Sequence, residues 1–245
     1  MEVIGHGFIA QNLATIAHRH PGATVVAAGV SSTSVRAPEE FAREEALVRE
    51  ITDRCHRAGH LVVYLSTASH AMYGSTEVAL DEEADVSPQS PYGRQKLRLE
   101  RSIAESGARW LTLRLSHVVG RMQRAHQLLP SLVGQVRSGT VQLHRGAHRD
   151  LVDVADVVRA VDGLLAQKLE GEIVNVASGV PQPIEAVVRG IERRMGITAR
   201  HEVIDTTPTL TRVSTAKLCG LLPPMRSVSE PDYLDRILDR YTSAY

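Results

Sequence analysis

Gly5-His6-Gly7-Phe8-Ile9-Ala10 follows a short apolar run, Met1 to Ile4, and precedes apolar residues at helical spacing that end before Pro21-Gly22. This pattern predicts a strand, a glycine turn and a helix. Glycines at such a turn let the backbone approach a pyrophosphate, which then faces the N-terminus of the helix. Strand-to-helix turns in other proteins also carry two glycines, so the motif needs support from the rest of the chain.

Outward from this turn, short apolar runs alternate with helical patterns. Strand-length runs occupy 24–28, 61–65, 110–115 and 172–177. Helical patterns occupy 38–57, 91–106, 125–138, 153–167 and 183–195, and a long loop is expected between 65 and 91. Such alternation indicates parallel βαβ units whose sheet is covered by helices on both faces.

The composition excludes several classes of protein. Lys plus Arg balance Asp plus Glu at 28 each, so no surface for nucleic acid is expected. Cys55 and Cys219 make neither a disulfide framework nor a zinc knuckle, and the histidine clusters at 18–20 and 144–148 lack ligand partners at metal spacing. No run approaches about 18 apolar residues, and no leader pattern opens the chain. A cytoplasmic protein with no membrane segment and no metal is expected.

Tyr92-Gly93-Arg94-Gln95-Lys96 opens the helix expected at 91–106, which places Tyr92 and Lys96 at i and i+4 on one helical face. An ammonium beside a phenol stabilises the phenolate and makes the tyrosine a usable general acid or base. This pair suits proton transfer to a carbonyl oxygen. The alternative is a tyrosine ring that caps the core beside a solvated lysine.

Leu65-Ser66-Thr67-Ala68-Ser69 places small hydroxyls at the carboxyl end of a buried strand, where parallel sheets bind ligands. Taken together, these segments resemble the extended short-chain dehydrogenase/reductase family, also called NAD-dependent epimerase/dehydratases. Members carry a glycine-rich first turn, a Ser or Thr after the fifth strand, a Tyr-Gly such as Tyr73-Gly74, and then Y-x-x-x-K.

The resemblance covers nearly the whole chain. Leu113 to Gly120 is similar to the family's LR-xx-xVYG segment, and Arg149 to Val157 is similar to its RDxxHVxDV segment. Asn175 to Gly179 and Lys217 to Pro223 fit the NxxxG and LG-x-P positions. The resemblance implies a single α/β domain: a reduced Rossmann-type, doubly wound and mostly parallel sheet with a small C-terminal substrate lobe. The core would take about 1–117 and 150–180, and the lobe about 118–149 and 181–245.

One departure from the family concerns its second and third strands. Ala27-Ala28-Gly29 resembles the family's fourth-strand AAG, so only one helix separates the first strand from the fourth. No residues remain for the two strands between them, nor for the side chain that reads the adenosine ribose. NAD and NADP therefore cannot be told apart from the sequence. Arg36 is the one nearby side chain that could favour NADPH.

The resemblance also implies the roles of individual residues. Tyr92 would deliver the proton, supported electrostatically by Lys96, and Thr67 or Ser69 would hold the carbonyl. Counting from the strand selects Thr67, and counting back from Tyr73 selects Ser69; we prefer Thr67 because a strand end is the firmer anchor. Cofactor contacts are expected at Gly5, Gly7, Phe8, Ile9, Ala28, Gly29, Ser66, Tyr92 and Lys96. Arg149 would contact the diphosphate of a substrate, and His117 is assigned equally to substrate contact or to loop packing.

The implied activity is NAD(P)H-dependent reduction of a keto group on a nucleotide-linked sugar, with a 4-keto-6-deoxyhexose as the best single substrate. The first alternative is an epimerase or dehydratase that retains its NAD. Dehydratases of the family usually carry Asp-Glu after the catalytic Thr, where this chain has Ala68 and Ser69, and this argues against dehydration. The second alternative is a non-catalytic dinucleotide-sensing or scaffold protein. A homodimer is a further expectation.

Overall fold

A five-stranded parallel sheet forms the centre of the computed structural model, which describes residues 1–31, 35 and 37–245. Its strands lie side by side in the order β1 (Glu2–Ile4), β2 (Ala23–Val26), β3 (Leu61–Thr67), β5 (Arg109–Leu115) and β10 (Glu172–Val176). Every neighbouring pair is parallel. The sheet is short at β1 and longest at β3 and β5, which are its buried middle strands.

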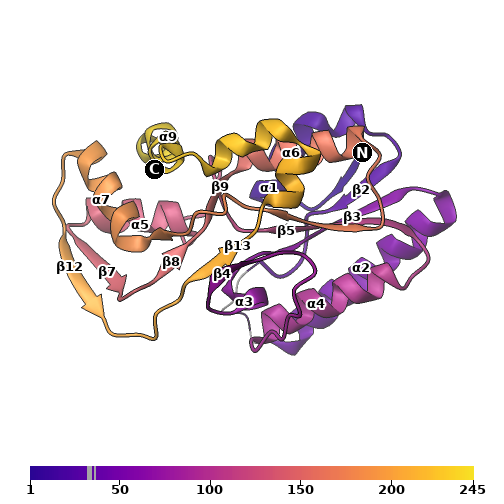
Figure 1. Cartoon of the computed structure of the whole chain (residues 1–245), viewed down its shortest axis with the longest axis horizontal. Coiled ribbons are helices and arrows are strands. Elements are labelled where there is room, and N and C mark those ends of the chain that lie inside the picture. The colour runs from indigo at the N-terminus through magenta and orange to yellow at the C-terminus, as the bar shows by residue number, and fades with distance from the viewer. Residues whose placement is uncertain (32–34, 36) are drawn as a thin grey trace.

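Helices cover both faces of this sheet (Figure 1). On one face lie α1 (Phe8–Leu13), extended by a 3₁₀ turn over Ala14–Arg19, and α6 (Val154–Ala166). On the other face lie α2 (Pro38–Ala58) and α4 (Pro91–Ala104). Side chains alternate along β3 accordingly: Val63 belongs to the core beneath α1 and α6, whereas Tyr64 belongs to the core beneath α2 and α4. The predicted α/β class with a mostly parallel, doubly covered sheet is confirmed.

The strand order never reverses. In a doubly wound sheet the strands run 3-2-1-4-5-6, with the reversal next to strand 1. Here β1, β2, β3 and β5 take positions 1, 4, 5 and 6, and residues 5–22 between β1 and β2 form only the glycine turn, α1 and its 3₁₀ extension. The second and third strands are thus absent from this stretch, as predicted, and β1 forms the edge of the sheet.

The absence of the second and third strands changes the handedness of the first crossover connection. The crossovers β1–α1–β2 and β2–α2–β3 step in the same direction along the sheet, yet α1 and α2 lie on opposite faces. The two crossovers therefore have opposite hands, although such connections are right-handed in about 98% of cases. In a complete sheet, α1 would lead the other way, to strand 2, and would obey the rule.

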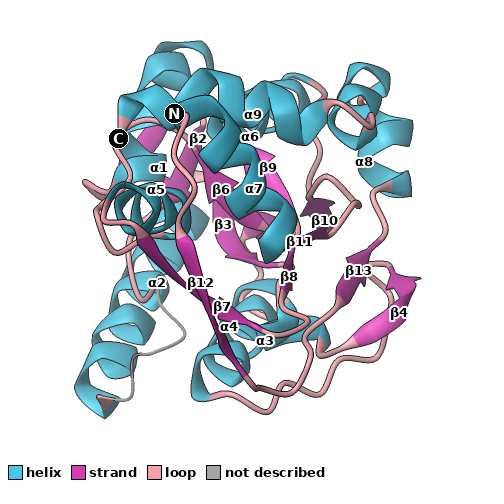
Figure 2. Cartoon of the chain, turned by 90° about the vertical axis from the view of Figure 1, so that its left-hand side faces the viewer, coloured by secondary structure: helices cyan, strands magenta, loops and turns pink. Residues whose placement is uncertain are grey.

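Among the described residues, four short strand pairs lie outside the central sheet. Figure 2 shows two of these pairs away from that sheet, residues 140–144 with 200–204 and residues 76–80 with 211–213. The pairs are β6 (His117–Val119) with β9 (Leu151–Asp153), β8 (His148–Arg149) with β11 (Gln182–Pro183), β7 (Thr140–His144) with β12 (Arg200–Ile204), and β4 (Thr76–Leu80) with β13 (Thr211–Val213). The long loop expected between 65 and 91 was only partly right, because it contains α3 (His70–Tyr73) as well as β4.

The remaining helices pack around the second half of the chain. They are α5 (Leu128–Arg137), α7 (Ile184–Met195), α8 (Ala216–Leu221) and α9 (Tyr233–Tyr241), with 3₁₀ turns at Pro223–Ser229 and Thr242–Ala244. One apolar core runs without a break from under β3 to residues such as Val133 and Val188 in α5 and α7. None of the helices in the described ranges has the length and apolar character needed to cross a bilayer.

Candidate active site

The glycine turn between β1 and α1 combines one crowded position with one open position. Gly5 has φ +132°, and a Cβ there would lie 2.5 Å from the carbonyl oxygen of Ala27. Gly7 precedes the first turn of α1, and a Cβ there would meet nothing within 4 Å. Phe8 is buried and can offer only backbone groups to a ligand, whereas Ile9 is partly buried and packs against the core. The turn thus has the space and the free N–H groups that a pyrophosphate needs.

Tyr92 stands at the start of α4, where two local features fix it. The Ser90 hydroxyl accepts a hydrogen bond of 3.0 Å from the Gly93 N–H and caps the helix. A Cβ on Gly93 would lie 1.9 Å from the carbonyl oxygen of Ala71, so α4 packs directly against α3. Only glycine permits this approach, which brings the Tyr92 ring onto Ala71 of α3.

Lys96 lies one turn further along α4 and is buried. Its Nζ is 5.6 Å from the centroid of the Tyr92 ring and 5.3 Å from that of Tyr64 on β3. It also donates a hydrogen bond of 2.7 Å to Oε1 of Glu44, on α2. Burial opposes the charge on Lys96, but the two tyrosines and Glu44 outweigh it and raise the lysine's pKa. Lys96 is 4% exposed, so the alternative of a solvated lysine does not hold.

The two candidate hydroxyls occur together. Thr67 is the last residue of β3 and is buried, and its hydroxyl donates a hydrogen bond of 2.8 Å to that of Ser69. The Ser69 oxygen also accepts from the N–H of Ala71 at 3.2 Å and caps α3. The hydroxyl proton of Ser69 therefore remains free to be donated elsewhere, and Ser69 is the less buried of the two. Ser66 is buried, and its hydroxyl has no partner among the described residues.

Three positions from the motifs meet in one buried network beneath these hydroxyls. The Tyr73 hydroxyl donates to Oδ1 of Asn175 at 2.8 Å and accepts from Nη1 of Arg114 at 2.9 Å. Arg114 is paired at 2.7 Å with Glu100 on α4, and each side chain is 3% exposed. The network ties the carboxyl halves of β5 and β10 to α4 at Glu100, about two turns beyond Tyr92.

Residues 9–177 match the family model described as NAD dependent epimerase/dehydratase family. The chain belongs to that family. A search of curated protein sequences finds no match.

Solved structures of similar fold support the architecture of the family. MoeE5 in complex with UDP-glucose and NAD superposes with a TM-score of 0.85 at 19% identity, covering 100% of this chain and 98% of that one. RMD from Pseudomonas aeruginosa complexed with NADPH gives 0.78 at 19% identity, with 99% and 98% covered. The UDP-glucose 4-epimerase of Thermus thermophilus in complex with NAD gives 0.73 at 22% identity, with 93% and 82% covered.

Glu44 is the site residue that sequence reasoning missed. Gly29, in the loop that follows β2, has φ +112°, and a Cβ there would lie 2.4 Å from Oε1 of Glu44. The carboxylate thus stands between Gly29, an expected cofactor contact, and Lys96. The sequence indicates the burial of Glu44 only weakly, through its helical spacing with Val48, Ile51 and Cys55 on the buried stripe of α2. A carboxylate in an apolar stripe requires a partner, and here the partner is Lys96.

His117 and Arg149 come together where β6 and β8 approach the end of the sheet. The His117 N–H bonds to the carbonyl of Asp150 at 2.9 Å. Nη1 of Arg149 donates to the His148 carbonyl at 2.7 Å and to the Thr209 hydroxyl at 3.2 Å. No carboxylate pairs with Arg149 within the described parts of the chain, and burial lowers its pKa.

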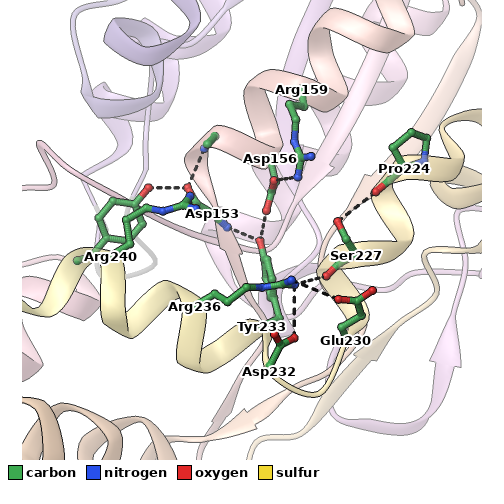
Figure 3. A network of polar contacts seen from close by, with 12 residues as sticks. Asp153, Asp156, Arg159, Pro224, Ser227, Glu230, Asp232, Tyr233, Arg236 and Arg240 are labelled. Carbon is green, nitrogen blue, oxygen red and sulfur yellow. Dashed lines mark hydrogen bonds and ion pairs between the residues drawn. The ribbon is translucent and has the colours of Figure 1, made fainter.

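A purely structural arginine at position 149 would pair with a neighbouring carboxylate, for which Asp153 is the candidate in the sequence. The structure pairs Asp153 instead with Arg240, at 2.6 Å, and with the hydroxyl of Tyr241, at 2.7 Å. Figure 3 shows this network, in which Tyr233 links the backbone of Asp153 to the carboxylate of Asp156. These contacts tie α6 to α9 and leave the Arg149 guanidinium available.

His117 gives the protein an expected acid sensitivity. Burial, with the nearby charge of Arg149, lowers the pKa of His117 to about 3. An unfolded chain protonates histidine near pH 6.5. Between about pH 6.5 and pH 3 the unfolded state therefore binds a proton that the folded state does not, and the free energy of unfolding falls as the pH falls. His117→Gln should remove this part of the slope, measured by urea denaturation at a series of pH values. Above about pH 7.5 the two slopes should coincide; equal slopes below pH 6 would contradict the shift.

Proposed function

We propose that this protein reduces a keto group on a nucleotide-linked sugar, with a nicotinamide dinucleotide as reductant. The observation that carries the proposal is the group formed by Tyr92, buried Lys96 and the hydroxyls of Thr67 and Ser69 at the carboxyl end of β3. When bound, the cofactor supplies the hydride. The glycine turn at Gly5 and Gly7 would hold its pyrophosphate.

Each side chain of the group has its own role in the proposed reaction. Tyr92 gives its proton to the carbonyl oxygen, and Lys96 holds the charge that stabilises the phenolate left behind. Ser69 has a free hydroxyl proton and the more open position, so it is the donor to the carbonyl, with Thr67 behind it. This assignment reverses the preference for Thr67 drawn from strand-end counting.

Nucleotide sugars as substrates are supported by two observations. The similar structures include complexes with UDP-glucose, and Arg149 offers a half-buried guanidinium without a carboxylate partner in the described structure. Arginine suits diphosphate because its planar fork can make two parallel hydrogen bonds. The epimerase alternative uses the same group of residues but returns the hydride to the same sugar.

Cofactor consumption separates the alternatives. Purified protein is mixed with NADPH or NADH and a 4-keto-6-deoxy nucleotide sugar, and the absorbance of the reduced cofactor is followed. A reductase consumes cofactor in proportion to product. An epimerase changes the sugar with no net consumption. Binding with neither change would leave the sensor alternative and contradict our proposal.

Arg149→Ala should raise the substrate KM far more than it lowers kcat, because the arginine is assigned to the diphosphate and not to the reacting carbon. Charge-assisted hydrogen bonds of this kind contribute about 1.5–3 kcal/mol, which corresponds to a KM increase of roughly tenfold to a hundredfold. Arg145→Ala is the matched control, since Arg145 is exposed and pairs with Asp205 at the surface. An unchanged KM for the Arg149 variant would contradict the assignment.

NADH and NADPH should bind with dissociation constants within about tenfold of each other, roughly 1.4 kcal/mol. With β1 at the sheet edge, no strand in the described parts of the chain lies beyond it to present a residue to the adenosine ribose. Arg36, the one nearby side chain considered for NADPH, lies outside the described residues. Titration calorimetry with both cofactors measures the ratio, and a preference above about a hundredfold would show a dedicated ribose site.

A further inference from the structure

Glu44 carries a buried carboxylate that the proposed mechanism leaves without a role. It is 2% exposed, and its Oε1 accepts the hydrogen bond of 2.7 Å from Nζ of Lys96. Its Oε2 has no hydrogen-bond partner in the described structure. A buried carboxylate with one partner is costly unless that partner needs its charge. The negative charge of Glu44 therefore acts mainly on Lys96 and on the groups around that lysine.

Those groups come from three elements packed around the ammonium. Tyr64 comes from β3 and is fully buried, Tyr92 comes from α4, and Glu44 comes from α2. The Lys96 ammonium stands 5.3 Å and 5.6 Å from the two ring centroids. Together with Lys96, they are the titratable groups that face this site in the described residues. Charges act more strongly here than at the surface, because little water screens them.

We propose that Glu44 is a positioning residue that keeps Tyr92 and Lys96 together in their fully protonated form. An ammonium without a carboxylate partner lowers the pKa of a neighbouring phenol. It thereby favours the phenolate, which is the form that abstracts a proton from an alcohol. A carboxylate bonded to that ammonium makes loss of any proton from the pair less favourable. The fully protonated form is the one that donates to a carbonyl oxygen. The inference rests on the proposed function, because it takes Tyr92 to be the proton donor.

Glu44→Gln tests this role, because glutamine keeps the length of the side chain and an oxygen for Lys96 but removes the charge. The ionisation of Tyr92 is followed by the ultraviolet absorbance of tyrosinate, taken as the difference between each protein and the same protein carrying Tyr92→Phe. We expect Tyr92 to lose its proton at a pH lower by about one unit in the glutamine variant. The basic limb of kcat/KM for reduction should move down by a similar amount.

Glu45→Gln is the matched control. Glu45 is the next residue of α2 and pairs at 2.7 Å with Arg98, so it joins the same two helices, but the pair is exposed. This variant should leave both the titration and the pH profile unmoved. If Glu44→Gln proves too unstable to titrate, Glu44→Asp is the second variant, because its shorter side chain places the carboxylate further from Lys96 but keeps the charge. The pH at which Tyr92 ionises should then move in the same direction by a smaller amount.

The outcomes separate this inference from the proposed function. The titration needs no substrate, so a Tyr92 signal that stays in place or moves to higher pH in both Glu44 variants overturns the role of Glu44. Failure of the wild type to oxidise NADH or NADPH with any keto-sugar nucleotide contradicts the proposed function instead. A shift in the titration with no shift in the basic limb of reduction also overturns the inference, because Glu44 would then not govern the donor.

Discussion

Tyr92→Phe is expected to lower turnover at least a hundredfold while the protein remains folded. The substitution keeps the ring that packs on Ala71 and Val30 and removes the hydroxyl that would donate the proton. General acid catalysis contributes typically about 10²–10⁴-fold, so the loss should fall in that range. Steady-state kinetics with saturating cofactor measures it, and circular dichroism checks the fold.

Tyr241→Phe serves as the control for the loss of a tyrosine hydroxyl. That hydroxyl bonds to Asp153 in the network between α6 and α9. Its removal should change stability but leave kcat within a few fold of wild type. Equal turnover of the Tyr92→Phe variant and the wild type would remove Tyr92 from the mechanism.

Glu100→Gln is expected to have the largest effect on stability. Glu100 and Arg114 are buried, and the carboxylate accepts from Nε at 3.1 Å and from Nη2 at 2.7 Å. Loss of the negative charge leaves the guanidinium buried without compensation. Breaking one partner of such a pair costs about 3–5 kcal/mol of the free energy of unfolding. Urea denaturation of both proteins measures the difference.

The exposed pair between Glu45 and Arg98 is the matched control for this experiment, because it also carries one glutamate and one arginine. Its glutamine variant should lose no more than about 1 kcal/mol. A Glu100→Gln protein as stable as this control would mean that water or a rearrangement of nearby side chains compensates the charge of Arg114. The network would then contribute little to holding α4.

The sheet was predictable because its strands are apolar runs of the right length. β3 is buried along all seven of its residues, and its continuous apolar pattern is typical of a parallel strand with both faces covered. The absence of the second and third strands followed from simple counting between β1 and β2. The short pairs, such as β8 with β11, could not be predicted, since two residues carry no periodicity and their pairing depends on tertiary contacts.

The candidate site was likewise predictable only in part. Tyr92 and Lys96 were visible because one helix fixes their spacing, and Thr67 because a strand ends there. Glu44 joins them from another helix, 52 positions before Lys96, and that proximity depends on how α2 packs against α4. The pairing of Asp153 with Arg240 could not be predicted from the sequence either, because the two residues lie 87 positions apart.

The place of β1 at the sheet edge links ligand binding to local unfolding. β1 has three residues and pairs with β2 alone, so the hydrogen bonds that hold it are few and open first in native-state fluctuations. The glycine turn, which we propose as the pyrophosphate site, begins at the residue after this strand. A dinucleotide bound there adds RT ln(1 + [L]/Kd) to the stability of the closed form. Amide exchange at β1 would then report cofactor occupancy, and the cell's dinucleotide concentration would set how often this edge of the sheet frays.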